Sequence, residues 1–297
     1  MTITVVRDAL QHLVINDGKA LVDTNGTPFD TAAYSRMKYG DAKVARDWGV
    51  ALARHFVANH PRLAFDSRRV IVTGPSYKYL STAAQGVAEA FSTVFNSARV
   101  VRGLEPSLSL HIIRAWVGSD SYAMASMEER ARQLPAGGQH VDHGLIQGSV
   151  VIVIDDVSIT GTTERAIQAH IEPAEPAALC FLHVADVDQE QALANSAIED
   201  AMNKMVAPTL DTFRMLVMTG NMRLNSRVFR TIMETSTTDP AGLVRFMRSV
   251  PDHFLMTMYD ALVGGTVEMF ERYPLATGML RRELLDRNLY YATMIAE

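Results

Sequence analysis

Residues 150–163 read VVIVIDDVSITGTT, and the fold expected for the chain follows from this segment. Its first five residues are all β-branched and hydrophobic, which is typical of a strand that is covered on both faces. The adjacent acids Asp155 and Asp156 follow, then a short turn that contains Gly161, and residues 164–171 have the spacing of a helix. A strand, a glycine-containing turn and a helix in this order predict one unit of a parallel α/β sheet.

The segments on either side continue this alternation. Residues 70–73, 108–116 and 177–185 are short apolar runs that favour buried strands. Residues 81–95 carry apolar side chains at helical spacing. The repeated order of strand, helix and strand predicts a mainly parallel sheet with right-handed crossovers and helices on its faces.

The two ends of the chain differ from this middle part. Residues 1–65 contain turn signals that favour a small hairpin near 12–24, and a helix is expected over about 41–59. The C-terminal part has no strand signal, and the helices expected over 252–273 and 275–291 include a break at Gly264-Gly265. We therefore expect an N-terminal hood and helix (1–65), a core (66–205) and a helical extension (206–297).

Composition narrows the class of protein. The 297 residues are 48% hydrophobic and 21% charged, with a formal net charge of −5 and no block rich in Lys or Arg, so a nucleic-acid surface is not expected. Neither a secretory leader nor an apolar run of ~20 residues is apparent, and we expect a cytoplasmic protein without a membrane partner. Cys180 is the single cysteine, which excludes an intramolecular disulfide, and it is expected to be a buried hydrophobic residue.

The turn after the predicted strand has the chemistry of a phosphate site. A helix N-terminus offers unpaired N–H groups, Gly161 allows the backbone to approach an anion, and four residues add hydroxyl groups. Asp155 and Asp156 lie just upstream, where they could accept hydrogen bonds from two neighbouring hydroxyls of a sugar. The hydroxyl residues are Ser158, Thr160, Thr162 and Thr163.

The sequence does not match two common phosphate-binding motifs, and a purely structural role explains this turn less well than a phosphate site does. Neither Gly-x-x-x-x-Gly-Lys-Ser/Thr nor a Gly-x-Gly-x-x-Gly turn after a strand occurs in the sequence. The acids could merely end a strand while Thr163 caps a helix, but the whole string of residues is far rarer than either feature alone.

The string DDVSITGTT resembles the signature D-D-V-x-T-T-G-x-T of type I phosphoribosyltransferases, with a departure at Ile159 that could remove one hydroxyl facing the phosphate. This resemblance implies the type I phosphoribosyltransferase fold, with 5-phosphoribosyl diphosphate (PRPP) and Mg²⁺ as substrate and cofactor. Residues 140–148, HVDHGLIQG, resemble the segment that leads into the signature strand of orotate-type members. The combination of YSRMKYGD, residues 73–80 and a helical tail looks like the phosphoribosyltransferases of bacterial tellurium-resistance and stress gene clusters.

The resemblance also implies roles for individual residues. Asp155 and Asp156 would hold the ribose hydroxyls, and Ser158 with residues 160–163 would hold the 5-phosphate. Arg114 lies where orotate-type members place a basic residue before a mobile loop, here 117–138. No direct protein ligand is expected for Mg²⁺, which PRPP and water would hold. The diphosphate would be held by Ser76, Tyr77 and Lys78. Both Lys78 and Arg114 could instead be ordinary surface residues.

Recognition of the acceptor is expected in the hood, where aromatic rings can stack on a base and cations can bind an anionic group. The same segment could instead be the ordinary start of the next helix. The candidates are Tyr34, Arg36, Lys38 and Tyr39.

The function implied is transfer of a phosphoribosyl group from PRPP to a nitrogenous base or related acceptor, with release of diphosphate. The alternative is a regulatory protein that binds PRPP or a nucleotide without transferase activity, and a scaffold that has lost the activity is a third possibility. Dimers are frequent in the resembled family, and the Met- and Leu-rich C-terminal helices could supply the interface of a homodimer or could equally just cover the sheet, so the oligomeric state is left open.

Overall fold

The computed structural model describes residues 3–16, 20–114, 139–195, 198–206 and 208–289. The chain divides into two compact units. The first comprises Met1–Met37 and Lys43–Val206, and the second comprises Lys38–Ala42 and Ala207–Glu297.

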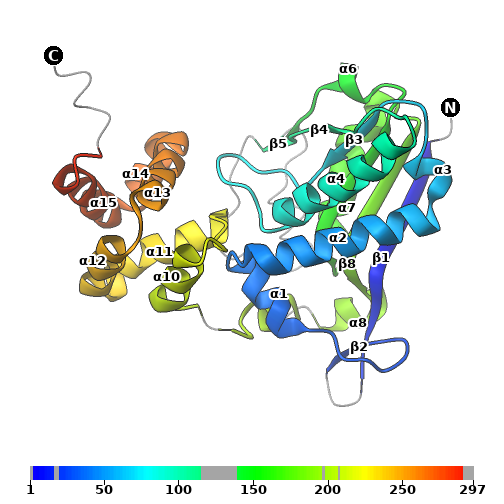
Figure 1. Cartoon of the computed structure of the whole chain (residues 1–297). Helices are drawn as coiled ribbons and strands as arrows, with labels where there is room; N and C mark the ends of the chain where they lie inside the picture. The colour runs from blue at the N-terminus through cyan, green and yellow to red at the C-terminus, as the bar shows by residue number, and fades with distance from the viewer. Residues whose placement is uncertain (1–2, 17–19, 115–138, 196–197, 207, 290–297) are drawn as a thin grey trace. The chain divides into compact units, whose positions relative to one another are not determined.

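The first unit is built on a six-stranded sheet with the order β2-β1-β8-β7-β3-β4 (Figure 1). All neighbouring strands are parallel except the β1–β2 pair, which is the hairpin expected near residues 12–24. A separate antiparallel pair joins β5 and β6. The strands are β1 (Thr4–Ile15), β2 (Leu21–Asp23), β3 (Val70–Thr73), β4 (Leu108–Ser109), β5 (Ile113–Arg114), β6 (Gln139–His140), β7 (Val150–Ser158) and β8 (Ala178–Val187).

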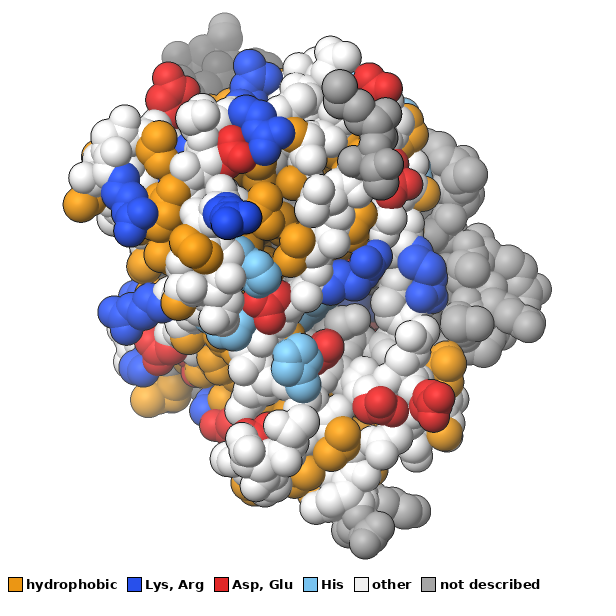
Figure 2. All heavy atoms as spheres, turned by 90° about the vertical axis from the view of Figure 1, so that its right-hand side faces the viewer, with side chains coloured by type: hydrophobic (Ala, Val, Ile, Leu, Met, Phe, Trp, Pro, Cys, Tyr) orange, Lys and Arg blue, Asp and Glu red, His pale blue; other side chains and the backbone are white. Residues whose placement is uncertain are grey.

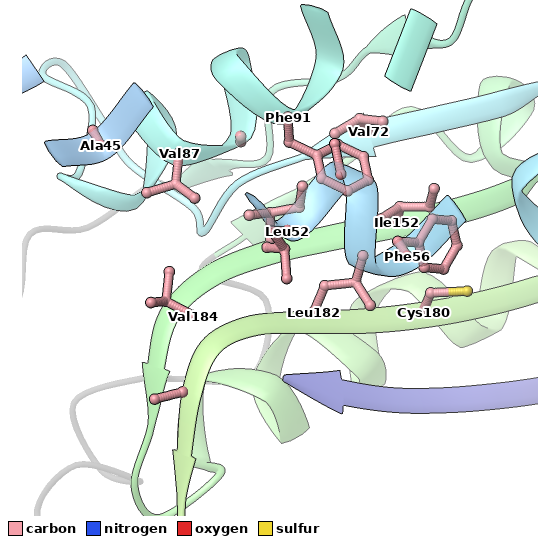
Figure 3. Close-up of a cluster of buried hydrophobic side chains, with 14 of the residues drawn as sticks. Ala45, Leu52, Phe56, Val72, Val87, Phe91, Ile152, Cys180, Leu182 and Val184 are labelled. Carbon is pink, nitrogen blue, oxygen red and sulfur yellow. The ribbon is translucent and has the colours of Figure 1, made fainter. Parts of the chain in front are cut away.

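Helices cover both faces of this sheet, as an α/β fold requires. On one face, α2 and α4 pack against alternate residues of the central strands, and Figure 3 shows Leu52, Phe56 and Phe91 over Ile152 and Leu182. The other face is covered by residues of α6 and α7. The helices of this unit are α1 (Thr31–Lys38), α2 (Ala42–Asn59), α3 (Pro61–Ala64), α4 (Ala84–Val101), α6 (His143–Ile146), α7 (Thr162–Ile171), α8 (Gln189–Ala194) and α9 (Ile198–Asn203), with a 3-10 turn at Glu172–Ala174.

The central elements confirm the α/β prediction. The strand over 70–73 has the predicted bounds, and the helix over 164–171 starts two residues earlier, at Thr162. The strand predicted at 150–154 continues to Ser158, so both acids belong to it rather than following it. The run 108–116 forms two short strands, β4 and β5, instead of one. Cys180 is fully buried as expected, and burial raises the pKa of its thiol to about 12.

The N-terminal strand was not predicted as part of the central sheet. β1 runs parallel to β8, from the Thr4–Ala178 pair to the Leu13–Val187 pair. Polar residues such as Arg7, Asp8 and His12 interrupt its apolar pattern, and its partner strand lies far away in the sequence. β1, the helices that follow it and the rest of the sheet belong to the first compact unit.

A carboxylate on β1 is held by two histidines from the adjoining helical segment. Asp8 Oδ2 lies 2.9 Å from His55 Nε2 and 2.6 Å from His60 Nε2. Burial acts to raise the pKa of Asp8, but the hydrogen bonds from His55 and His60, the charge of His55 and a bond from Ala9 N together outweigh it, so the pKa lies below its ordinary value of 3.8. Figure 2 looks onto the side of the molecule that carries β1 and α3, where histidine and acidic side chains lie together. This cluster joins the helical segment to the sheet.

The second unit is helical throughout its described part, as the sequence predicted for the C-terminal region. Asn225 caps α11 through hydrogen bonds from Arg227 N and Val228 N, and the break at Gly264-Gly265 separates α13 from α14 as expected. Its core comprises apolar side chains that include Phe229, Phe246 and Leu255. The helices are α10 (Leu210–Met218), α11 (Ser226–Thr238), α12 (Pro240–Ser249), α13 (Asp252–Gly264), α14 (Thr266–Arg272) and α15 (Pro274–Asp286).

The short segment Lys38–Ala42 belongs to this second unit because its backbone is bonded to it. Arg223 N donates to Gly40 O at 2.9 Å, and Asn225 Nδ2 donates to Lys38 O at 3.2 Å. Gly40 has φ +89°, and a Cβ there would lie 2.7 Å from Arg223 O, so only glycine fits this close approach. Over the ranges that the structure describes, every helix is too short or too polar to cross a lipid bilayer.

Candidate functional site

The two acids of the signature lie at the carboxyl end of β7, near the middle of the sheet. Successive side chains of a strand point to opposite faces. Val151 and Val153 pack on the α7 side and Ile152 and Ile154 on the opposite face, and beyond the two acids Val157 and Ile159 pack with the second group. Asp155 is partly exposed, whereas Asp156 is only 5% exposed. Asp155 is thus the more accessible of the two for a ligand.

The backbone fixes both carboxylates. Asp156 N donates to Asp155 Oδ1 and Val157 N donates to Asp156 Oδ1, each at 2.8 Å. Each of these hydrogen bonds restricts the rotamer of the carboxylate that accepts it. The end of β7 therefore presents oriented acceptors, which is what two hydroxyls of a sugar would need.

The turn after β7 separates an apolar residue from a set of hydroxyls. Ile159 is 7% exposed and belongs to the hydrophobic core. The position at which this chain departs from the signature is therefore buried in the core. Thr160 Oγ1 and Thr162 Oγ1 lie 2.9 Å apart. Gly161 between them has φ +64°, a left-handed conformation that favours glycine. The turn thus keeps two hydroxyls together beside an exposed backbone.

The start of α7 has the features of an anion site. Gly161 is its N-cap and has no side chain to accept from the N–H groups of the first turn. Those N–H groups and the positive end of the helix dipole favour a negatively charged ligand. Thr162, in the first turn of α7, is 9% exposed, and Thr163 is partly exposed. Ser158 is the last residue of β7, where it pairs with Asp186 of β8. The predicted phosphate residues therefore surround one turn.

The predicted diphosphate loop lies at the same edge of the sheet. β3 ends at Thr73, which pairs with Val153 of β7, two residues before Asp155. Ser76 is 5% exposed and Lys78 is partly exposed, with its Nζ 4.6 Å from the centre of the Tyr79 ring. Because parallel strands end at a common edge, the loops after β3 and β7 flank the same space.

Arg114 is joined to this diphosphate loop through Tyr77. Tyr77 N donates to Ile112 O at 3.3 Å, and Arg114 N donates to Tyr77 O at 3.0 Å. The Tyr77 ring stacks on His111, with 3.7 Å between ring centroids. The structure therefore brings Arg114 next to residues 76–78, although they are far apart in the sequence. The predicted mobile loop 117–138 lies outside the described residues.

The four predicted acceptor residues do not share one environment. Tyr34 is 1% exposed and packs near Phe29 in the hydrophobic core, so its ring has no free face for a base. Arg36 is exposed. Lys38 and Tyr39 belong to the second unit, where the Tyr39 ring lies against Phe213 and below Arg227. Tyr34 and Arg36 differ because side chains two positions apart in a helix point in different directions, and Tyr39 lies beyond the end of α1.

His183 is a residue of this region that the sequence did not single out. It pairs with Asp155 across the β7–β8 ladder and is 6% exposed. Burial lowers the pKa of His183, and the nearby carboxylates Glu164, Asp186 and Asp156 oppose this shift only in part. The imidazole is therefore neutral near pH 7. A single histidine inside the apolar run 177–185 was the signal that could have marked it.

A comparison with known protein families matches this chain to one of them. The family model described as "PRTase ComF-like" matches residues 17–276, which include both loops and most of the helical unit. The chain belongs to this phosphoribosyltransferase (PRTase) family. The type I PRTase fold predicted from the signature is thereby confirmed. None of the curated proteins matches this PRTase sequence significantly.

Hypoxanthine phosphoribosyltransferases are among the solved structures that resemble this chain. A hypoxanthine-guanine phosphoribosyltransferase from Bacillus anthracis is 18% identical over 50% of this chain and 70% of its own, with a TM-score of 0.27. A hypoxanthine phosphoribosyltransferase from Trypanosoma cruzi is 14% identical over 50% of this chain and 68% of its own, with a TM-score of 0.33. The family match, and not these partial likenesses, carries the assignment.

Proposed function

We propose that this protein is an enzyme that uses PRPP and Mg²⁺ to transfer a phosphoribosyl group to a nitrogenous base or related acceptor, releasing diphosphate. The observation that carries the proposal is the turn after β7 in a chain of the PRTase family. There, Gly161 in a left-handed conformation exposes the uncapped N-terminus of α7 beside two adjacent hydroxyls.

The ribose 5-phosphate part of PRPP would bind at this turn. The N–H groups of the first turn of α7 and the hydroxyls of Ser158, Thr160, Thr162 and Thr163 would donate to the phosphate oxygens. The carboxylate of Asp155 would accept from the ribose hydroxyls, and Asp156, which is more buried, would fix the end of the strand or accept the second hydroxyl. These contacts would place carbon 1 of the ribose over the edge of the sheet.

The diphosphate would lie against the loop after β3. Ser76, Tyr77 and Lys78 would donate to its oxygens, and Arg114, which is bonded to Tyr77, would add a second positive charge. When the bond from carbon 1 to diphosphate breaks, negative charge grows on the leaving group and positive charge grows on the ribose ring. Donors already held in place stabilise such charge because they need little reorganisation during the reaction.

The carboxylates at the end of β7 suit an Mg²⁺ ion that is bound mainly by PRPP and water. Mg²⁺ takes oxygen ligands and keeps several waters, so one or two protein carboxylates suffice. Within the described ranges no three His, Cys, Asp or Glu side chains are grouped to hold a metal ion. Asp155, partly exposed at the end of β7, would orient the ribose hydroxyls of the substrate that carries the ion. When bound, Mg²⁺ would neutralise charge on the leaving group.

Several finer points stay predictions. These are the assignment to the tellurium-resistance and stress-cluster branch, the cytoplasmic location, the homodimer and the identity of the acceptor. Of the predicted acceptor residues, the exposed Arg36 is the candidate in the first unit, and Lys38 and Tyr39 are candidates in the second.

The test is diphosphate release by the full-length protein incubated with PRPP, Mg²⁺ and a panel of purine, pyrimidine and pyridine bases. We expect release that depends on both Mg²⁺ and one class of base, and loss of that release in Asp155→Asn. Tight PRPP binding without release on any base would favour the regulatory alternative. Absence of PRPP binding would contradict the proposal.

A further inference from the structure

The turn that would hold the 5-phosphate has no cation of its own. Residues 155–164 contain two adjacent acids and Glu164 but no Lys or Arg. A phosphate monoester carries a charge of about −1.5 to −2 at pH 7, and two carboxylates at the same edge of the sheet repel it. The N–H groups and hydroxyls of the turn are neutral donors, so a nearby positive charge would strengthen binding of the phosphate substantially.

Arg165 is the cation nearest to this turn along the chain. Side chains of an α-helix tilt toward its N-terminus, and Arg165 lies one turn after the start of α7. Its Nη2 donates to Thr162 Oγ1 at 3.3 Å, and Thr162 Oγ1 lies 2.9 Å from Thr160 Oγ1. Its Nη1 lies 3.2 Å from the place that a Cβ on Gly161 would occupy. The guanidinium therefore lies over the left-handed glycine, beside both hydroxyls.

Within the described part of the chain, the guanidinium of Arg165 lies near the positive end of α7 without a carboxylate partner to hold it there. The helix dipole disfavours a cation close to the start of a helix. The neighbouring Glu164 is engaged by Arg7, which also bonds Gln168. Among the residues that the structure describes, the contacts of Arg165 are to Thr162 and to its own helix, and no carboxylate pairs with it. An anion at the turn would offset the repulsion.

We infer that Arg165 binds the 5-phosphate of the ribose phosphate and makes the turn after β7 selective for phosphorylated sugars. This inference rests on the proposed function, because it names a further ligand for the same substrate. The planar guanidinium can donate two parallel hydrogen bonds to phosphate oxygens, while the N–H groups of α7 bind the remaining oxygen.

The experiment measures binding of ribose 5-phosphate and of PRPP with Mg²⁺ to the full-length protein by isothermal titration calorimetry. The variants are Arg165→Gln, Arg165→Lys and, as a matched control, Arg54→Gln, which changes an exposed arginine of α2 on the other face of the sheet. We expect Arg165→Gln to weaken both ligands at least tenfold, the loss of a charged hydrogen bond. Arg165→Lys should recover part of the affinity, and Arg54→Gln should match the unaltered protein.

The possible failures are distinct from one another. If the unaltered protein binds ribose 5-phosphate and Arg165→Gln binds it within twofold as tightly, the role of Arg165 is wrong and the proposed function stands. If the unaltered protein binds neither ribose 5-phosphate nor PRPP, the proposed function itself is wrong. Equal melting temperatures for all the variants would show that each is folded.

Discussion

The turn after β7 and the segment around residues 34–39 both contain polar and aromatic candidates for a binding site, yet they are arranged differently in the structure. In the turn, Thr160, Gly161 and Thr162 stay together beside the acids of β7. In the other segment, Tyr34 enters the core while Tyr39 packs in a different unit. A turn between a strand and a helix gathers consecutive residues, whereas α1 points Tyr34 and Arg36 in different directions and ends before Tyr39.

The largest effect that would test this difference is on stability. Tyr34→Ala removes a ring that is 1% exposed and packed near Phe29, so the free energy of unfolding should fall by about 3–5 kcal/mol. Arg36→Ala, an exposed position of the same helix, should change it by less than about 0.5 kcal/mol. Urea unfolding measures both variants. A Tyr34→Ala protein as stable as the unaltered one would restore Tyr34 as a candidate acceptor residue.

The second effect is on binding at the turn after β7. Replacing both Asp155 and Asp156 by Asn keeps the size of the side chains but removes two charged acceptors. We expect PRPP affinity to fall about a hundredfold, or ~2.7 kcal/mol, while the fold is retained. Calorimetric titration measures the affinity and circular dichroism checks the fold. Unchanged affinity would remove the acids from the site.

The third effect distinguishes two roles of Gly161: it leaves space for a ligand, and it adopts a left-handed backbone conformation. Gly161→Val places a β-branched side chain at φ +64° and, with its Cβ 3.2 Å from Arg165, over the proposed phosphate position. PRPP affinity should fall at least tenfold. Gly103→Val is the control, because Gly103 has φ +73° with nothing within 4 Å of its Cβ position. It should lower stability without changing affinity, and equal losses of affinity in both variants would argue against a phosphate at Gly161.

The smallest effect concerns a carboxylate that is structural. Asp8, held by His55 and His60, has a lowered pKa in the folded protein, so its contribution is complete above the ordinary value of 3.8 and is lost as the pH falls through the folded value. Asp8→Asn should cost about 1 kcal/mol at pH 6 and progressively less below pH ~4. Thermal unfolding across this pH range measures it. PRPP affinity should not change.

Local sequence was enough for the central strands and for the turn. The β-branched run of residues 150–154 and the glycine, threonines and acids that follow are contiguous, so their proximity needs no long-range information. β3 was equally local, because three apolar residues and Thr73, all β-branched, end at a glycine. Most of the phosphate site could therefore be predicted from one segment.

Long-range pairing accounts for what could not be predicted. Nothing in the polar-interrupted sequence of β1 shows that it lies beside β8. The proximity of His183 to Asp155 depends on the register of two strands, and that of Arg114 to Tyr77 depends on how the chain returns after α4. The burial of Tyr34 depends on which face of α1 meets the core. Arg165 was missed because only the direction of helical side chains brings it back to the turn.

A crystal structure of the full-length protein with PRPP and Mg²⁺ would show directly whether the turn after β7 is the phosphate site. We expect the 5-phosphate within hydrogen-bonding distance of the backbone N–H groups at the start of α7, with the ribose hydroxyls facing Asp155. A 5-phosphate bound anywhere else, with the turn after β7 left free, would show that the proposed site is wrong.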